Sequence, residues 1–348
     1  MTSKVLNTPS LSMQRLTVQE VRGRLQDKSV EVLTEIVKDN TRRMEGFTED
    51  SQLLTNGIFY PADYFEALKK AAKSSLSEYL RNTNAFFHGY TSPRHFDLVN
   101  DRLSPSGKKV ACFVLKNGVL PSEALHAMKN GLSLLGCGEV CQIAQYAAVE
   151  DVLGVEKFNA LFSSDSPTPL MIGARVPENP IARLRLYLMQ VDPPQAQIQK
   201  GDQVFIQNVN TYPFKHVLSH AQAFNVLCLN ATPGCQKFTG LGLPPEGLPH
   251  DHINEVLLGE FNLPQNSWER LSSTCKEICE KIFKKHLLKA VELKDTQLTP
   301  ESFKAEGGGI LQIVCALDAE RITALANSTL AEARKLLDGY DVEVRTRN

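Results

Sequence analysis

The sequence lacks any apolar run long enough to cross a membrane. No window of the 348 residues approaches 18 consecutive apolar residues, the length that a membrane-spanning helix needs. The first residues also lack the apolar core of a secretory signal. We therefore expect a cytoplasmic protein without a membrane partner, and export by a route that uses no cleaved signal stays open as an alternative.

Neither sign of charge is in excess. The sequence has 38 Lys and Arg residues against 39 Asp and Glu residues, which gives a net charge of −1. Binding to nucleic acid calls for a basic excess or patch, so we expect no nucleic-acid partner. The eight cysteines are scattered and lie mostly in apolar runs, which is typical of reduced thiols rather than of a disulfide framework.

The sequence also lacks internal repeats and low-complexity segments, and its helical patterns precede its β-rich runs. Helices followed by strands predict an α+β fold. The expected helices are 18–25, 30–39, 61–80, 121–129, 137–153, 155–162, 252–261, 267–290 and 320–337. The expected strands are 108–116, 169–175, 183–192, 202–209, 224–231, 235–243, 309–318 and 341–346.

These patterns suggest three parts of the chain. Residues 1–60 are expected to form a helical N-terminal extension, and residues 61–262 the core. Residues 263–348 are expected to form a C-terminal helix and a small β-α-β appendage.

The stretch GLSLLGCGEVCQIAQY at 131–146 raises a chemical question. Cys137 lies between two glycines, each of which costs a helix interior about 1 kcal/mol relative to alanine, so it is expected at a helix start. Apolar residues recur at helical spacing from Glu139 onward. A helix N-terminus can lower the pKa of a thiol, which makes Cys137 a candidate nucleophile. A buried structural thiol is the alternative.

A cysteine at a helix start, followed by strands with histidines, is also the layout of papain-like cysteine enzymes. We therefore expect a papain-like or NlpC/P60-like core, in which the helix that bears the cysteine packs on an antiparallel sheet. Cys141 lies one turn after Cys137, but two thiols are too few for a closed zinc site. No metal and no cofactor is expected.

The residues after Cys137 follow a longer pattern. A tyrosine comes nine positions later, and the segments LKNGVLPSEALHAMKNG and GDQVFIQN flank the motif. The motif residues are Tyr146, Ala148, Val149, Asp151, Leu153, Gly154, Glu156, Phe158, Asn159, Leu161 and Phe162. Over residues 111–262 this pattern resembles the spore-coat type of bacterial protein-glutamine gamma-glutamyltransferase (transglutaminase) family, with this chain as a divergent member.

The resemblance implies acyl transfer on glutamine side chains of a protein substrate, with lysine or water as the acceptor. It implies Cys137 as the nucleophile. Such chemistry needs donors to an oxyanion, and the backbone N–H groups of the helix near Gly138 are expected to supply one. Gln222 and Asn225 match a family stretch that reads Gln-Gly-Glu-Asn-Val and are expected to bind substrate. The oligomeric state is not implied.

Three family positions differ here. The family carries glutamate immediately before its cysteine, where this chain has Gly136. It carries a second functional glutamate where this chain has Phe224, and a histidine near the cysteine where this chain has Leu241. Another residue would have to activate the thiol.

His220 is the first candidate for that base. It lies four residues before Phe224, toward the same end of the expected sheet, and a base must come within hydrogen-bond reach of its nucleophile. The weaker candidates are His250, His252, His88 and His95.

Two other functions remain open. The lost helper positions favour a binding or scaffold protein that keeps a transglutaminase fold without turnover. A cysteine–histidine pair without acidic helpers favours a papain-like cysteine hydrolase.

Overall fold

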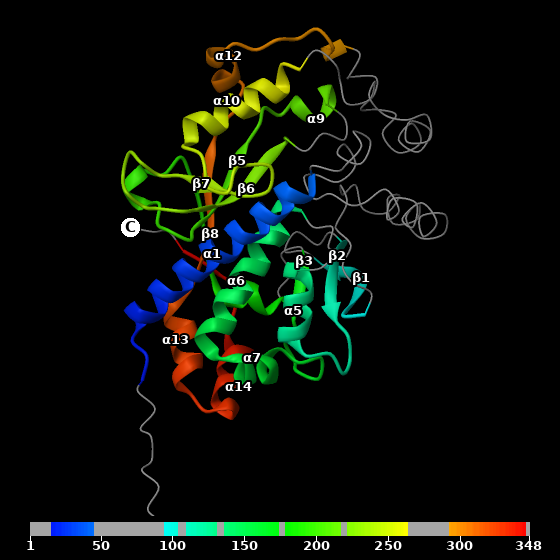
Figure 1. Ribbon diagram of the computed structural model, residues 1–348, viewed down its shortest axis with the longest axis vertical. Coiled ribbons are helices and arrows are strands. Elements are labelled where there is room, and N and C mark those ends of the chain that lie inside the picture. Colours follow the sequence, from blue (N-terminus) through cyan, green and yellow to red (C-terminus); the bar gives the residue numbers. More distant parts are fainter. Residues whose placement is uncertain are drawn as a thin grey trace, which may run out of the picture.

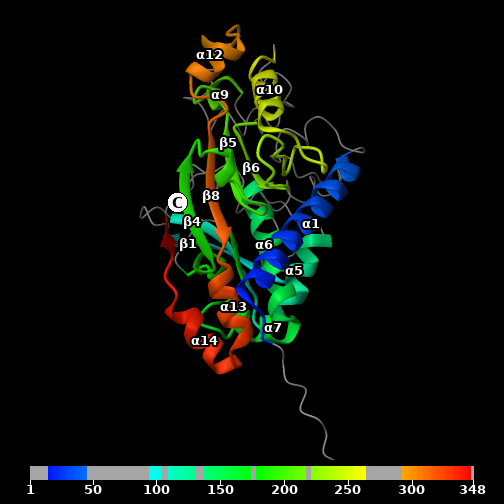
Figure 2. The ribbon, with the colours of Figure 1, turned by 90° about the vertical axis from the view of Figure 1, so that its left-hand side faces the viewer.

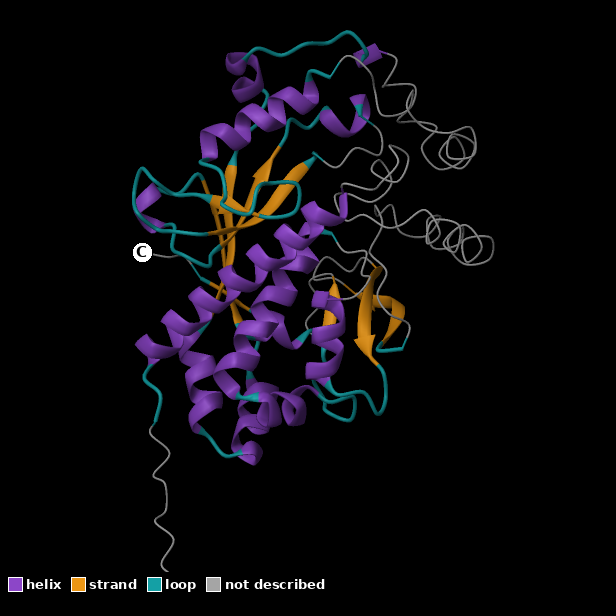
Figure 3. Ribbon diagram, in the orientation of Figure 1, coloured by secondary structure: helices purple, strands orange, loops and turns teal. Residues whose placement is uncertain are grey.

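The computed structural model describes residues 15–44, 94–103, 109–130, 136–173, 178–216, 221–263 and 292–345. The helices expected at 61–80 and 267–290 lie outside the described residues, as do His88 and His220. The described chain combines helices and sheets, in agreement with an α+β fold (Figure 3). None of the helices in these ranges is long and apolar enough to cross a membrane.

The larger sheet of the described chain has six strands in the order β7-β6-β5-β8-β4-β9. Neighbouring strands are antiparallel except β4 and β9, which are parallel. The strands are β4 (Arg185–Val191), β5 (Gln203–Gln207), β6 (Ala223–Cys228), β7 (Phe238–Thr239), β8 (Leu311–Leu317) and β9 (Glu343–Val344).

Strand β8 comes from the C-terminal part of the chain but lies in the middle of this sheet, between β5 and β4. The expectation of a separate C-terminal appendage does not fit this topology, because among the described strands β8 is the one that pairs with both β5 and β4. Burial of Ile313 and Cys315 on this strand adds to the core of the molecule. The C-terminal residues are therefore part of the core.

Helix α1 (Val18–Met44) is one continuous helix where the sequence pattern suggested two. Its buried residues Val21, Leu25, Val32 and Val37 recur at near-helical spacing and pack in the same core as helix α6 (Cys137–Leu153). The gap between the two expected helices falls in the middle of α1, where Asp27 is exposed and Ser29 is buried. Figures 1 and 2 show α1 running along α6, with both helices on one side of the large sheet.

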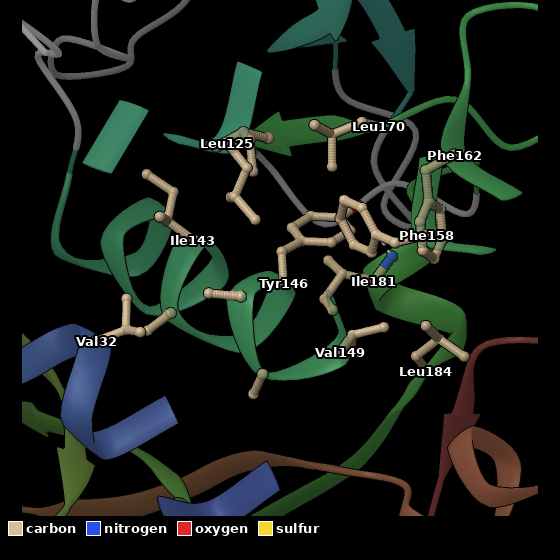
Figure 4. Packing of buried hydrophobic residues seen from close by; sticks show 14 of the residues in the cluster. Val32, Leu125, Ile143, Tyr146, Val149, Phe158, Phe162, Leu170, Ile181 and Leu184 are labelled. Atoms are coloured by element: carbon tan, nitrogen blue, oxygen red, sulfur yellow. Dashed lines mark hydrogen bonds between the residues drawn. The ribbon is translucent and has the colours of Figure 1, made fainter. Parts of the chain in front are cut away.

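Helix α6 is buried over most of its length. It ends at Gly154, whose φ of 78° suits glycine. Tyr146 is fully buried in the middle of the helix, with its ring edge-on to Phe158 and Phe162 (Figure 4). Its hydroxyl is hydrogen-bonded to Asn179 Oδ1 at 3.0 Å and Met171 O at 3.1 Å. These contacts anchor the helix that begins at Cys137.

The remaining elements surround these two layers. A smaller antiparallel sheet contains β1 (Phe96–Leu103), β2 (Lys109–Leu115) and β3 (Met171–Gly173). The helix expected at 320–337 is broken at Ser328, because the Thr329 side chain caps a new helix. The further helices are α5 (Pro121–Asn130), α7 (Val155–Phe162), α8 (Pro180–Arg183), η1 (Gln195–Gln197), α9 (Tyr212–Lys215), α10 (His250–Phe261), α12 (Pro300–Ala305), α13 (Ala319–Asn327) and α14 (Leu330–Gly339).

Candidate active site

Cys137 is the first residue of helix α6, as the sequence predicts. Its neighbour Gly136 is the N-cap, with extended backbone angles and no side chain to cap the helix. The Cys137 side chain is partly exposed, whereas Cys141, one turn later, is fully buried. Of the two thiols, Cys137 is therefore the one with a route to a substrate.

The side chain of Asn225 lies against the Cys137 thiol. Asn225 is in the middle of strand β6, and its Nδ2 donates a hydrogen bond to Cys137 Sγ over 3.2 Å. A Cβ added at Gly138 would lie 3.8 Å from Asn225 Nδ2, in ordinary contact. The structure thus brings together Cys137, Gly138 and Asn225, which the sequence analysis singled out separately.

The pKa of the Cys137 thiol is raised above its ordinary value, and burial is the largest cause. Hydrogen bonds from the side chain and backbone of Asn225 and from the backbone of Gly138 act in the opposite direction. The net direction is the reverse of the lowering that the helix N-terminus suggested, because removing a thiolate from water outweighs these donors. Cys137 is therefore a neutral thiol at ordinary pH.

Glu139 adds to this rise. Its negative charge raises the pKa of Cys137, and its carboxylate folds back over Gly136, where it would clash with any Cβ at position 136. A glutamate at N3 that reaches back to the helix start is a common capping arrangement. Position 136 therefore requires a glycine as long as Glu139 keeps this conformation.

Phe224 lies on the opposite face of β6 from Asn225, because successive side chains of a strand alternate. It is 3% exposed and packs in an apolar core with Val226, Leu243 and Ile253. The residue of β6 that faces the thiol is Asn225, so the position expected for an acid points away from Cys137.

Leu241 is buried in the core cluster against which Cys137 packs. Its loop lies close to the strand, since a Cβ at Gly240 would come within 2.6 Å of Asn225 O. The position at which the family resemblance implies a histidine is thus filled by an apolar side chain, in the same cluster as the thiol.

The other expected site residues are distributed as follows. Gln222 is partly exposed just before β6, and His220 lies outside the described residues. His250 Nε2 faces Gly309 O at 2.8 Å. His216, which was not among the candidates, is buried with its Nε2 at 2.8 Å from Phe261 O. His95 lies 3.5 Å from the Glu123 carboxylate, and His252 is exposed.

A buried cation lies beyond the thiols. Arg185 of β4 is 4% exposed, and its Nε donates to Gln145 Oε1 of α6 over 2.7 Å. Its charge lowers the pKa of Cys141, although burial keeps that pKa well above the ordinary value. Cys141 is therefore held as a neutral thiol within the core.

Gln203 and Arg185 were not among the site residues expected from the sequence. Both are buried polar residues on strands. The pairing of β5 with β6 places Gln203 within hydrogen-bond distance of Asn225, and Arg185 of β4 reaches Gln145 of α6. The alternation in RLRLYLMQV and GDQVFIQN marks inward positions, but it does not identify the residue that each would face. Over the described ranges, no group of three or more His, Cys, Asp and Glu side chains is placed to hold a metal ion.

Comparison with known proteins adds one distant likeness. No family model matches the chain, and no curated protein matches it. A solved structure of a transglutaminase from Geobacillus stearothermophilus (without C-terminal extension) is similar with a TM-score of 0.40 and 16% identity. The likeness covers 70% of this chain and 84% of that chain.

Proposed function

We propose that this protein transfers acyl groups from glutamine side chains of a protein substrate, with Cys137 as the nucleophile. The observation that carries the proposal is the hydrogen bond from Asn225 Nδ2 to the partly exposed Cys137 sulfur at the start of α6. A donor directed at a sulfur stabilises the thiolate, the reactive form of cysteine. The sequence resemblance around Cys137 and the packing of α6 against β6 are the further support.

The reaction has two steps. The thiolate attacks the γ-carboxamide carbon, and collapse of the tetrahedral intermediate releases ammonia once the nitrogen has gained a proton. The thioester carbonyl is then attacked by a lysine amine, which gives an isopeptide bond, or by water, which gives glutamate. Either acceptor gives up a proton, and the Cys137 thiol is restored.

The Gly138 backbone N–H is our candidate donor to the oxyanion, because it contributes to stabilising negative charge on the sulfur and lies in the first turn of α6. His220 is our candidate for the proton carrier, and Gln222 for a contact to substrate. In this proposal the core is papain-like, of the spore-coat transglutaminase type, and it needs no cofactor.

A second candidate function is a binding protein without turnover. Specific observations favour it: Phe224 and Leu241 are both packed in apolar cores, and the pKa of Cys137 is raised. In this alternative the Asn225–Cys137 pair is a structural hydrogen bond, and a primary amine is not incorporated into any substrate.

The first experiment is site-resolved labelling with iodoacetamide as a function of pH, read by mass spectrometry. If Cys137 is a working nucleophile, it labels faster at every pH than buried Cys141, and blocking it abolishes activity. Cys137→Ala removes the signal and Cys141→Ala is the matched control. A Cys137 that labels no faster than Cys141 would favour the binding protein.

The second experiment measures the reaction itself. Purified protein is incubated with a glutamine-containing protein and a fluorescent primary amine, and ammonia release is followed in parallel. We expect amine incorporation, or ammonia release alone for a deamidase, and loss of both in Cys137→Ala and Cys137→Ser. Activity that survives both substitutions would refute Cys137 as the nucleophile.

A further inference from the structure

Four side chains form a continuous hydrogen-bonded chain that ends at the candidate nucleophile. Cys315 Sγ of β8 donates to Gln203 Oε1 over 3.4 Å. Gln203 Nε2 of β5 donates to Asn225 Oδ1 over 3.3 Å. Asn225 Nδ2 of β6 donates to Cys137 Sγ over 3.2 Å. Every donor in this chain points toward Cys137.

Strand register places these residues on one face of the sheet. Gln203 is paired with Leu227 on one side and with Cys315 on the other, and Asn225 is paired with Phe205. Residues two apart on a strand, and partners across strands, share a face. Side chains from three adjacent strands therefore form one row across this face, and β6, at the end of the row, contacts α6.

The hydrogen-bonded chain is sheltered from water at the end formed by Cys315 and Gln203, its inner end. Gln203 is 6% exposed and Cys315 is fully buried, whereas Asn225 and Cys137 are partly exposed. A buried amide that loses its hydrogen bonds is left without a partner where water cannot replace them, so the buried partners of Gln203 favour one orientation of its amide. The orientation of the Gln203 amide, which Cys315 favours, then fixes the orientation of the Asn225 amide against Cys137.

Orientation matters because a primary amide has a donor end and an acceptor end. If the Asn225 amide were turned by half a rotation, its N–H groups would face those of Gln203, and its oxygen would face the Cys137 thiol. An oxygen would accept the S–H bond and stabilise the thiol, whereas an N–H donor stabilises the thiolate. The direction of the chain thus selects the reactive form.

We propose that Gln203 is a positioning residue, which turns the Asn225 amide so that its N–H group faces the Cys137 sulfur, and that Cys315 sets the direction of Gln203 in turn. This inference rests on the proposed role of Cys137 as the nucleophile only for its functional meaning. The orientation effect itself can be measured on the thiol without any substrate.

Within the described residues, other charged and titratable groups also act on the thiol of Cys137. Glu139 lies on the same helix as Cys137 and raises its pKa. Cys141, also on α6, interacts electrostatically with Cys137, Cys315 and Arg185 of β4. Each of these groups is unchanged by substitution of Gln203, so a change at Gln203 reports the hydrogen-bonded chain.

The test is the pH dependence of iodoacetamide labelling at Cys137 in Gln203→Met, which keeps the side-chain length and removes both hydrogen bonds. A hydrogen bond worth about 1 kcal/mol corresponds to a shift of roughly 0.5–1 pH unit. We call the pH at which the labelling rate is half its maximum the labelling midpoint. We expect it to rise by about that amount, so that labelling at a pH below the midpoint slows about three- to tenfold.

The matched control is Gln207→Met. Gln207 lies on the same strand and the same face, but its Nε2 donates to Gly307 O and takes no part in the chain. We expect its labelling profile to match that of the unmodified protein. Equal profiles for both methionine variants and the unmodified protein, with Gln203→Met folded by circular dichroism, would overturn the inference.

A second pair of variants covers the case in which Gln203→Met does not fold. Cys315→Ser keeps a donor to Gln203 and should retain the labelling midpoint, whereas Cys315→Ala removes the donor and should raise the midpoint. If Cys315→Ala leaves the midpoint unchanged, the inference fails. Asn225→Asp, which has no N–H to offer, should raise the midpoint most.

The outcomes separate this inference from the proposed function. A raised midpoint in Gln203→Met without any amine incorporation by the unmodified protein would keep the positioning role and refute acyl transfer. Amine incorporation with an unmoved midpoint would keep acyl transfer and refute the role of Gln203.

Discussion

The two faces of strand β6 differ in what they bury. Asn225 faces helix α6 and takes part in hydrogen bonds with Gln203 and Cys137. Phe224, Val226 and Cys228 face the other way and pack in an apolar core. Neighbours in the sequence therefore contact two different environments.

The difference separates stability from chemistry. Each apolar side chain buried on one face stabilises the fold without needing a specific partner. A polar group buried on the other face destabilises the fold unless it is hydrogen-bonded, and those hydrogen bonds then fix its geometry. The face toward α6 is accordingly the one that can hold a thiol in a defined setting, and the other face supports it.

The largest expected effect comes from the apolar face. Phe224→Ala should lower the free energy of unfolding by about 3–5 kcal/mol, because it removes a large buried side chain and leaves a cavity. Urea denaturation measures this loss. The labelling midpoint of Cys137 should stay unchanged, with Phe224→Leu as the milder control; a shift in both variants would mean that the two faces are coupled.

Cys228 of β6 and Cys137 of α6, which lies against the other face of β6, are both expected to make the protein less stable at alkaline pH. Burial raises the folded-state pKa of Cys228 to about 12 and also raises that of Cys137. An unfolded thiol ionises near pH 8.5, so above that pH the unfolded state binds fewer protons and stability falls as pH rises toward the folded-state values. Below about pH 8.5 this contribution is fully present.

Urea denaturation between pH 7 and 10.5, with a reductant, checks this prediction. Cys228→Ala and Cys137→Ala should each make the free energy of unfolding less dependent on pH in the alkaline range. If Cys228→Ala leaves the slope unchanged, the thiol on the apolar face is not the buried, neutral group that the structure indicates.

A smaller effect is expected from Glu139. Removing its charge in Glu139→Gln should lower the pKa of Cys137, since the carboxylate raises it. Labelling below the midpoint should speed up about two- to threefold, as for a charge interaction of roughly 0.5 kcal/mol near a surface. Glu150→Gln, at the other end of α6, is the control and should leave the rate unchanged.

The smallest effect is expected at Gly138. The site has room for a Cβ, which would be 3.8 Å from Asn225 Nδ2, and alanine favours a helix over glycine by up to about 1 kcal/mol. Gly138→Ala should therefore raise the melting temperature slightly without moving the labelling midpoint. A decrease in melting temperature would show that the first turn needs glycine for another reason.

Several elements follow from the sequence alone. The periodicity after Glu139 predicted α6 and its buried length, and the boundary glycines placed Cys137 at its first residue. Helices α5 and α7 and strand β2 also appear where the pattern placed them. These are local signals, because side-chain spacing, glycine and proline act on the backbone within a few residues.

Other features required the tertiary structure. The sequence suggested two helices in place of α1. One continuous helix forms because burying its apolar face against α6 outweighs the local break between residues 25 and 30. It suggested a C-terminal appendage, because nothing local indicates that β8 pairs between β5 and β4.

For the candidate site, the sequence by itself determined the thiol and the start of its helix. Only the tertiary structure decided that Asn225, and not residue 224, faces the sulfur, and that Gln203 and Cys315 stand behind it. The physical reason is that a helix start is encoded by neighbouring residues, whereas contacts between strands depend on register, and a shift by one residue would turn each side chain to the other face.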